Sequence, residues 1–315
     1  MELIRGLHNL RPRHRGCVLT IGVFDGVHIG HQALLERLSV LGEDFNLPSV
    51  LMIFEPQPQE VLPFMVTHAR LTPFREKMRA LMQTSVDRVL CVRFDKRFAR
   101  LTAMTFIEDI LVGGLGVQHV VVGDDFRFGH EAVGNTDLLR EMGAKYDFEV
   151  HRRDTYRVAG DRVSSTRIRN ALAIGQLDTA AELLGRPYAI SGRVRYGRQL
   201  GRTIGFPTAN VALKRRVSPL SGVFAVVARL RGDDRALPGV ANIGVRPTVD
   251  GETRLLEVHL FDVNEDLYGK YMRVEFLSKL REERRFESLD ELKAQIARDA
   301  DDARAYLGHV DLNAR

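Results

Sequence analysis

The chain has 315 residues, of which 44% are hydrophobic and 28% are charged, so we expect a globular protein of two domains. No apolar run approaches the roughly 20 residues of a membrane helix. Residues 1–16 lack the apolar core of a secretory signal, and two cysteines cannot form a disulfide framework. These features exclude a membrane protein and a disulfide-stapled secreted domain, and they predict a cytoplasmic location.

The net charge of +5 is unevenly distributed. Residues 1–184 carry 23 basic and 23 acidic side chains, whereas residues 185–315 carry 23 and 18. Between Arg186 and Arg216 there are eight basic residues and no acidic one. A basic stretch suits nucleic acid, a polyphosphate ligand or a solvated face. Glycines interrupt this stretch, which favours a compact phosphate ligand.

A turn between a predicted strand and a predicted helix is the most informative stretch of the first half. The apolar run Val18–Ile21 predicts a buried strand, and the spacing of the leucines that follow predicts a helix. The first N–H groups of a helix have no partner within it, so a phosphate can bind there. Three glycines would let the backbone approach such a ligand: Gly22, Gly26 and Gly30.

Two histidines of this turn, His28 and His31, are three residues apart, so both can point into one cleft. Each could donate a hydrogen bond to a phosphate oxygen, and a protonated ring would stabilise the charge on a pentavalent phosphorus. Two other interpretations stay open from the spacing alone. The pair could be ordinary turn histidines, or half of a zinc site, although both cysteines lie far away.

The whole turn resembles a family motif. Residues 22–31 read Gly-x-Phe-Asp-Gly-x-His-x-Gly-His, which resembles the HxGH signature of nucleotidylyltransferases in its FMN adenylyltransferase form. The resemblance implies a Rossmann-like domain that transfers AMP from ATP to FMN, with His28 and His31 as catalytic residues. It also implies nucleotide contacts from four residues of the turn: Gly22, Phe24, Asp25 and Gly30.

Short apolar strands and helices alternate through the rest of this half. We predict strands over residues 49–54, 88–92 and 119–123, and helices that begin at Thr72–Pro73 and after Thr105. The alternation indicates βαβ units and a parallel sheet. Loops at the carboxyl ends of such strands lie at the edge where open α/β sheets bind ligands.

Aromatic residues and prolines follow one of these strands. Phe54, Pro56 and Pro58 could form a flat wall for an aromatic ring, or an ordinary stiff loop. The family resemblance implies an isoalloxazine pocket at this loop, to which Phe126 and Phe128 would contribute. Gln57 receives no acid–base role, because many members of the family have histidine there.

Two further polar stretches complete the first half. Asp125 suits a contact to adenosine or magnesium, or simply a turn, and the family pattern around it implies a ligand role for it and for Asp124. The stretch Ser164–Arg169 could cap a helix or bind a second phosphate. It resembles the nucleotidylyltransferase motif that holds the ATP phosphates. That resemblance assigns phosphate contacts to three residues: Ser165, Thr166 and Arg169.

The sequence pattern changes near Gly185, where we predict the boundary between domains 1–184 and 185–315. A short helix with Asp178 as its N-cap should end at this glycine. The strands that follow alternate with period two and lack intervening helices, which predicts a small antiparallel β-barrel. A final helix that starts with a capping box at Ser288 should pack on the barrel.

A glycine-rich stretch over residues 197–210 allows backbone amides to surround phosphates. Thr208 and Asn210 are two apart, so on an extended segment their oxygens face one side and could hold magnesium. The stretch could also begin an edge strand. Residues 201–210 resemble the riboflavin kinase signature, which implies that Thr208 and Asn210 bind Mg–ATP. Five residues before them would contact the nucleotide: Gly197, Gly201, Arg202, Gly205 and Pro207.

Glu257 alternates with apolar residues along a predicted strand, so it should face away from the core together with His259. A carboxylate at such a position is usually solvated. The match to the Glu-x-His pattern of riboflavin kinases implies instead that Glu257 is the general base for the ribityl 5′-hydroxyl. His259 receives a structural role.

Four motifs in the expected order therefore resemble the bifunctional riboflavin kinase/FMN adenylyltransferase family along nearly the whole chain. The resemblance implies an α/β Rossmann-like domain followed by a mainly β barrel with a terminal helix. The implied product is FAD, made by phosphorylation of riboflavin to FMN and adenylylation of FMN. The implied catalytic residues are four: Glu257, His28, His31 and Arg169.

The expected ligands are ATP as co-substrate, Mg²⁺, riboflavin, FMN and FAD. We expect no nucleic acid or membrane as partner, and weak self-association at most. Two alternatives stay open. One is another HxGH mononucleotide adenylyltransferase with an accessory barrel. The other is a nucleotide-sensing module whose basic barrel binds RNA, although this barrel has few aromatic residues to stack on bases.

Overall fold

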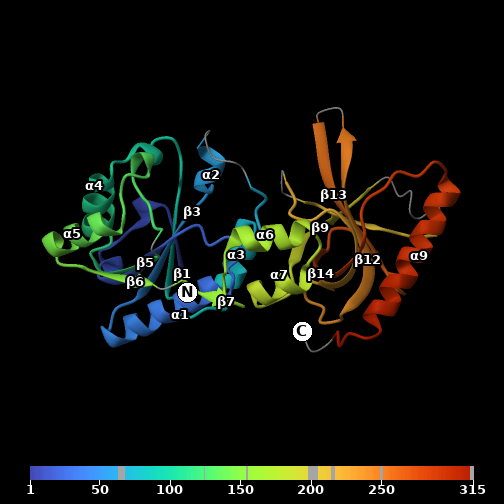
Figure 1. Ribbon diagram of the computed structural model, residues 1–315, viewed down its shortest axis with the longest axis horizontal. Helices are drawn as coiled ribbons and strands as arrows, with labels where there is room; N and C mark the ends of the chain where they lie inside the picture. The colour runs from blue at the N-terminus through green and yellow to red at the C-terminus, as the bar shows by residue number, and fades with distance from the viewer. Residues whose placement is uncertain are drawn as a thin grey trace. The chain divides into compact units, whose positions relative to one another are not determined.

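Two compact units make up the chain in the computed structural model (Figure 1). The first comprises residues 1–68 and 74–164, and the second comprises residues 69–73 and 165–315. The structure describes seven ranges: residues 1–62, 68–123, 125–153, 155–197, 205–213, 217–248 and 251–312.

A six-stranded parallel sheet with the order β1-β4-β3-β2-β5-β6 forms the centre of the first unit. β3 and β4 have the predicted bounds, whereas the sequence pattern did not reveal β1 and β6. These two are the edge strands, and both carry the charged residues common at sheet edges. The strands are β1 (Glu2–Arg5), β2 (Cys17–Ile21), β3 (Ser49–Phe54), β4 (Arg88–Val92), β5 (Val117–Gly123) and β6 (Glu149–Arg153).

The sheet buries both of its faces. Along β3, Val50 and Met52 pack into one apolar cluster, whereas Leu51 and Ile53 pack into another. A strand covered on both sides reads as a continuous apolar run rather than as an alternation, which is why β3 was recognisable from its composition. The parallel sheet of the predicted Rossmann-like fold is confirmed.

Helices and short turns connect these strands. α3 begins at Phe74, one residue later than predicted. The predicted cap at Thr105 is wrong, because the N–H of Thr105 itself donates to Thr102 Oγ1 at 3.0 Å, so Thr102 is the cap. The elements are α1 (Ile29–Asp44), α2 (Pro58–Val61), α3 (Phe74–Leu81), α4 (Ala103–Thr105), the π-helix η4 (Phe106–Gly114), α5 (Thr136–Tyr146), the 3-10 turns η1 (Leu7–Asn9), η2 (Pro12–His14), η3 (Phe98–Arg100) and η5 (His130–Ala132), and the hairpin of β7 (Arg157–Val158) and β8 (Asp161–Arg162).

The second unit contains a closed antiparallel barrel with the order β10-β13-β12-β11-β14-β9, as the fold prediction required. Helix α9 (Leu289–Leu307) lies along one side of the barrel (Figure 1). The strands are β9 (Ala189–Arg195), β10 (Ala209–Val211), β11 (Gly222–Leu230), β12 (Leu237–Thr248), β13 (Gly251–Leu260) and β14 (Tyr271–Arg281).

Helix α9 decides which barrel strands are apolar on both faces. Val223 and Val227 of β11 pack against Ala303 and Leu307 of α9, so the outer face of β11 is buried as well as the inner one. On β13 the outward residues are only partly buried. The outer wall at β13 is therefore available for polar side chains.

Helices α6 (Ser165–Ala173) and α7 (Leu177–Leu184) belong to the second unit, although the period of the sequence changes only near Gly185. α7 packs against β14, and its N-cap is Gln176 rather than the predicted Asp178. Gly185 ends α7 in the left-handed conformation, as predicted. No helix in the described ranges is both long and apolar enough to cross a bilayer.

Candidate functional site

The glycine-rich turn connects β2 to α1 at the carboxyl edge of the parallel sheet. His28 is the N-cap of α1, and its Nδ1 accepts a hydrogen bond from the N–H of His31 at 3.2 Å. Because Nδ1 accepts, the proton of a neutral His28 ring lies on Nε2, the nitrogen that would donate to a phosphate. The cap therefore fixes both the place and the tautomer of this imidazole.

The two imidazoles lie against each other. The His28 and His31 rings stack with centroids 3.6 Å apart, and the Phe24 ring stacks on His31 at 4.4 Å. Gly22 and Gly30 make this packing possible, because a Cβ at Gly22 would lie 2.9 Å from the Phe24 ring. A Cβ at Gly30 would lie 3.2 Å from the His28 ring. Both glycines thus have a local packing reason beside the predicted nucleotide contact.

Two residues of this turn have a strained backbone conformation. Phe24 and Val27 have φ angles of 50° and 43°, a region that L-residues other than Asn and Asp seldom occupy. Asp25 between them is 2% exposed. Strained residues persist only where the surroundings hold them, and they cluster at functional sites.

One residue that the sequence interpretation missed holds this turn. Lys77 of α3 is completely buried, and its Nζ donates to the carbonyl oxygen of Val23 at 2.6 Å. A fully buried lysine is rare and requires a strong partner. The only signal in the sequence was its position four residues before Leu81, on the buried face of α3.

Aromatic rings form a continuous row between the predicted flavin residues of the first unit. Phe54, at the end of β3, lies 5.6 Å from Phe98, which contacts Phe106 at 6.3 Å. Phe106 lies 5.5 Å from Phe128, and Phe126 stacks on Phe128 at 5.5 Å. The structure thus brings Phe54 and Phe128 into one row, although Phe128 is buried in the core.

The loop with Pro56 and Pro58 is shorter than predicted, because Pro58 already begins α2. Gln57 between them is completely buried, and its Oε1 accepts from Gln59 Nε2 at 2.9 Å. Its Nε2 has no hydrogen-bond partner within the described ranges. A buried, unsatisfied donor costs free energy unless a ligand or a water pairs with it.

The predicted nucleotide residues around Asp125 and in the Ser164–Arg169 stretch lie outside the His28 turn. Asp125 is exposed and pairs with Arg162 at 2.8 Å, while Asp124 lies outside the described residues. Ser165 and Thr166 begin α6 in the second unit, and Arg169 Nε donates to the carbonyl oxygen of Ala69 at 2.7 Å.

Three polar side chains line up across neighbouring strands of the barrel. Asn210 of β10 and Asn242 of β12 both pair in register with Glu257 of β13. Directly opposed residues in a sheet present their side chains to the same face. The inward neighbours Leu256 and Val258 are completely buried, so these polar groups lie on the outer wall of the barrel.

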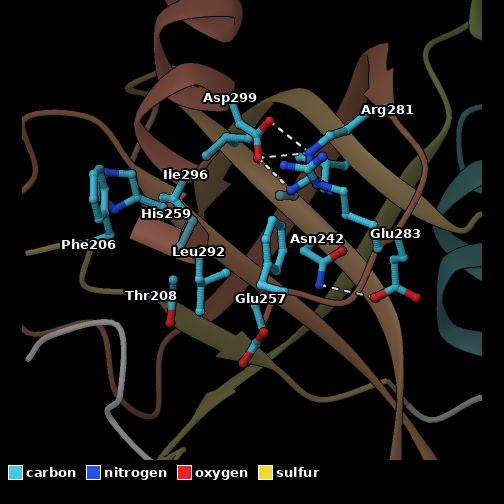
Figure 2. Close-up of a pocket in the computed structure, with 15 residues that line it drawn as sticks. Phe206, Thr208, Asn242, Glu257, His259, Arg281, Glu283, Leu292, Ile296 and Asp299 are labelled. Atoms are coloured by element: carbon cyan, nitrogen blue, oxygen red, sulfur yellow. Dashed lines mark hydrogen bonds and ion pairs between the residues drawn. The ribbon is translucent and has the colours of Figure 1, made fainter. Parts of the chain in front are cut away.

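Glu257 borders a pocket between this wall, α9 and the segment after β14 (Figure 2). Burial raises the pKa of the Glu257 carboxyl above its usual value, and the negative charge of Glu283 raises it further. Thr208 also lines the pocket, whereas Asn210 lies against Gly197, where a Cβ would overlap its amide. A carboxylate with a raised pKa in a pocket is suited to accept a proton.

Asn242 and His259 complete this wall. The sequence interpretation did not identify Asn242, and it gave His259 only a structural role. Asn242 Nδ2 donates to Glu283 Oε1 at 3.3 Å, but its buried Oδ1 has no partner among the described residues. His259 Nδ1 donates to the carbonyl oxygen of Pro207 at 2.9 Å and thereby ties the segment before Thr208 to β13. The alternation on β13 and the Glu-x-His pattern were the sequence signals for His259, and the tie to Pro207 was not predicted.

Of the predicted nucleotide residues near this wall, Gly197 and Gly205 lie within the described ranges, and Gly205 has a φ of 89°. Pro207 is exposed. Gly201 and Arg202 lie outside the described residues.

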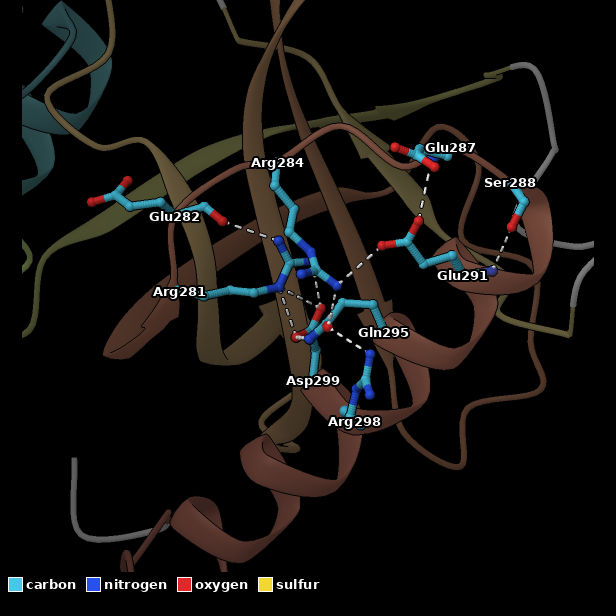
Figure 3. Close-up of polar contacts among 9 residues, drawn as sticks. All are labelled: Arg281, Glu282, Arg284, Glu287, Ser288, Glu291, Gln295, Arg298 and Asp299. Atoms are coloured by element: carbon cyan, nitrogen blue, oxygen red, sulfur yellow. Dashed lines mark hydrogen bonds and ion pairs between the residues drawn. The ribbon is translucent and has the colours of Figure 1, made fainter.

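A partly buried ion pair lies on the opposite wall. Arg281 of β14 binds Asp299 of α9 through Nε and Nη2 at 2.9 and 2.7 Å, and Asp299 also accepts from Gln295 at 2.8 Å (Figure 3). The Arg284 guanidinium lies 4.8 Å from the centre of the Phe286 ring. The Arg281 contact ties the middle of α9 to β14 beside the pocket, where Leu292 and Ile296 supply the apolar side chains of the helix.

Comparisons with known proteins match both halves of the chain. Family models described as FAD synthetase and riboflavin kinase match residues 10–167 and 184–307. The chain is 56% identical to the bifunctional riboflavin kinase/FMN adenylyltransferase of Escherichia coli K12 over 98% of both chains. It is 52% identical to the protein of that name from Pseudomonas fluorescens over 97% of both.

Among solved structures, a Streptococcus pneumoniae protein described as a macrolide-efflux protein superposes with a TM-score of 0.82. It is 30% identical, and the match covers 96% of this chain and 99% of that one. Both halves of the chain are thus accounted for by relatives of similar length. The chain belongs to the bifunctional riboflavin kinase/FMN adenylyltransferase family.

Proposed function

We propose that this protein makes FAD from riboflavin in two ATP-dependent reactions. Residues 185–315 would phosphorylate riboflavin to FMN, and residues 1–184 would transfer AMP from ATP to FMN. The observation that carries the proposal is the 56% identity to a bifunctional enzyme across both halves of the chain. Neither alternative, another mononucleotide adenylyltransferase or an RNA-binding sensor, accounts for that match.

In the kinase reaction, Glu257 accepts the proton of the ribityl 5′-hydroxyl while the oxygen attacks the γ-phosphorus of ATP. The bond from that phosphorus to the ADP oxygen breaks, and ADP leaves. The raised pKa of the carboxyl brings its basicity closer to neutrality, which makes proton transfer from an alcohol more favourable. The apolar side of α9 would exclude water from this transfer.

Thr208 and Asn210 would hold magnesium with the ATP phosphates. A hydroxyl and an amide oxygen are hard ligands, and Mg²⁺ usually takes few protein groups when phosphates complete its shell. The Asn210 amide lies close to the backbone of Gly197, where only glycine leaves room for it. Bound Mg²⁺ would neutralise charge on the transferred phosphoryl group.

The unsatisfied Asn242 Oδ1 supports a role in flavin binding. It is buried at the edge of a cavity of about 230 Å³ whose other side includes the apolar side chains of Leu292 and Ile296. Small-molecule sites typically combine an apolar lining with a few polar groups that fix orientation. We assign this oxygen a hydrogen bond to the flavin or its ribityl chain.

In the adenylylation, a phosphate oxygen of FMN attacks the α-phosphorus of ATP and pyrophosphate leaves. No protein nucleophile is needed, so the protein aligns the two phosphates and stabilises charge. His28 Nε2 and His31 would donate to these phosphates. Phe54, Pro56, Pro58, Phe126 and the unsatisfied Gln57 Nε2 would contact the flavin.

Further assignments in this reaction follow from sequence motifs. Ser165, Thr166 and Arg169 would bind ATP phosphates, and Asp125 would contact the nucleotide. The absence of a nucleic-acid partner, weak self-association and a cytoplasmic location also remain predictions. Salt-sensitive retention of RNA would contradict the first of them.

One incubation tests both activities. The purified protein is supplied with riboflavin, ATP and magnesium, and the flavins are separated by chromatography. We expect FMN and then FAD. The absence of both products would refute the proposal, and FMN without FAD would refute its adenylyltransferase half.

A further inference from the structure

Three metal-ligating side chains meet on the first unit at a place that neither proposed reaction uses. His119 Nδ1 lies 3.1 Å from His151 Nε2 and 3.7 Å from Glu149 Oε2, and His151 Nε2 lies 3.6 Å from the same carboxylate oxygen. Each of these residues offers one ligand atom, and within the described ranges the three atoms all lie within 4.8 Å of one another. The three atoms form a nearly equilateral triangle.

The sheet itself produces this convergence. His119 of β5 and Glu149 of β6 are opposed in register on neighbouring parallel strands, so their side chains leave the same face. His151 is two residues after Glu149 and therefore shares that face. The Phe45 ring packs 4.0 Å from the His119 ring and restricts its orientation. The triangle is thus set by strand register and packing, and not by long flexible side chains alone.

We propose that His119, Glu149 and His151 bind a divalent transition-metal ion, zinc in preference, with water as the fourth ligand. Zinc binds imidazole nitrogen and carboxylate oxygen at about 2.0–2.1 Å in a tetrahedron, which places neighbouring ligand atoms about 3.3–3.4 Å apart. The observed separations of 3.1, 3.6 and 3.7 Å bracket that value. Two imidazoles disfavour magnesium and calcium, which prefer oxygen ligands.

The site has an open side and a buried side. The side chain of His119 is 7% exposed, that of His151 is 26% exposed and that of Glu149 is 69% exposed. An ion can therefore enter from solvent past Glu149, and a water can occupy the fourth position. The buried His119 fixes the inner vertex.

The position in the sheet gives the ion a structural role. His119 and Glu149 lie near the amino ends of β5 and β6, whereas the His28 turn follows the carboxyl end of β2 in the same parallel sheet. β6 is an edge strand. A bound ion would link this edge strand to β5 and leave the proposed adenylylation site untouched.

Cobalt(II) is the probe for the test, because a tetrahedral Co²⁺ site with nitrogen ligands absorbs visible light strongly. The full chain, without a histidine tag, is stripped with a chelator and titrated with Co²⁺, then with Zn²⁺. We expect one equivalent of Co²⁺ to produce the tetrahedral bands and Zn²⁺ to abolish them. Zn²⁺ should also raise the melting temperature of the stripped protein.

Amino-acid substitutions test which residues bind the Co²⁺ ion. His151→Ala and Glu149→Gln change partly exposed groups, so the fold should survive, and each should weaken Co²⁺ binding at least about 10- to 100-fold. His28→Ala and His309→Ala should leave the titration unchanged. The proposal is overturned if the wild-type protein shows no tetrahedral bands, since the three residues then form only a hydrogen-bonded network. Bands that persist in His151→Ala, or disappear in His28→Ala, also overturn it.

Discussion

The turn after β2 and the outer wall of the barrel differ in the chemical groups that they present to their proposed substrates. The turn offers a helix start and two stacked imidazoles. The barrel wall offers a carboxylate with a raised pKa between two asparagines. This difference matches the different nucleophiles of the two proposed reactions. The FMN phosphate is already ionised and needs only alignment, whereas an alcohol must lose a proton and needs a base.

The largest expected effect is that of Glu257→Gln. Loss of a general base should slow riboflavin phosphorylation by about 10²- to 10⁴-fold, because glutamine keeps the shape but cannot accept the proton. FAD formation from supplied FMN should stay at the wild-type rate. Chromatography of both reactions measures this. A loss of both activities would contradict separate sites.

His28→Ala should have the opposite effect. Removing a donor to the transferred group should slow FAD formation by about 10²- to 10³-fold and leave FMN formation unchanged. His28→Asn is the matched variant, because asparagine can still cap α1. If His28→Asn restores full FAD formation, the ring acts only as a cap and the catalytic assignment is wrong.

Lys77→Met tests whether the buried lysine positions the turn. A hydrogen bond from a charged donor contributes about 1.5–3 kcal/mol, so kcat/KM for FAD formation should fall about 10- to 100-fold, mainly through KM for ATP. The kinase reaction and the exposed Lys145→Met control should be unaffected. A lower melting temperature with an unchanged KM would restrict Lys77 to stability.

Glu283→Gln should shift a pH profile rather than abolish activity. Glu283 helps to raise the pKa of Glu257, so its neutralisation should lower that pKa and keep Glu257 ionised at more acidic pH. The acidic limb of riboflavin phosphorylation should therefore move to lower pH. Glu282→Gln, which removes an exposed partner of Lys279, should leave the limb in place. A shift to higher pH would contradict the electrostatic cause.

The smallest expected effect is that of Ser288→Ala. The Ser288 hydroxyl accepts a hydrogen bond from the backbone N–H of Glu291 at 3.1 Å. The Glu291 carboxylate accepts from the backbone N–H of Glu287 and not from that of Ser288, so the predicted capping box is only half formed. Loss of this cap should cost about 1 kcal/mol of unfolding free energy, with both activities retained. Denaturant unfolding measures it, and a large loss of FMN formation would show that the cap also shapes the pocket.

Local sequence alone determined the fold class and the main motifs. The continuous apolar runs of β3 and β4, the glycines around His28 and His31, and the alternation around Glu257 depend on period and residue type, which the chain carries locally. The family motifs added the reaction class. The short, charged edge strands β1 and β6 were missed because edge position overrides apolar patterning.

Only the tertiary structure decided which distant residues meet. Lys77 reaches Val23 across 54 positions, His259 reaches Pro207 across 52, and Glu283 approaches Glu257 only when β14 and β13 close into one barrel. No local pattern encodes such meetings, because strand register and helix packing set them. The same cause brings His119 to Glu149 and His151, whose convergence depends on the parallel pairing of two strands.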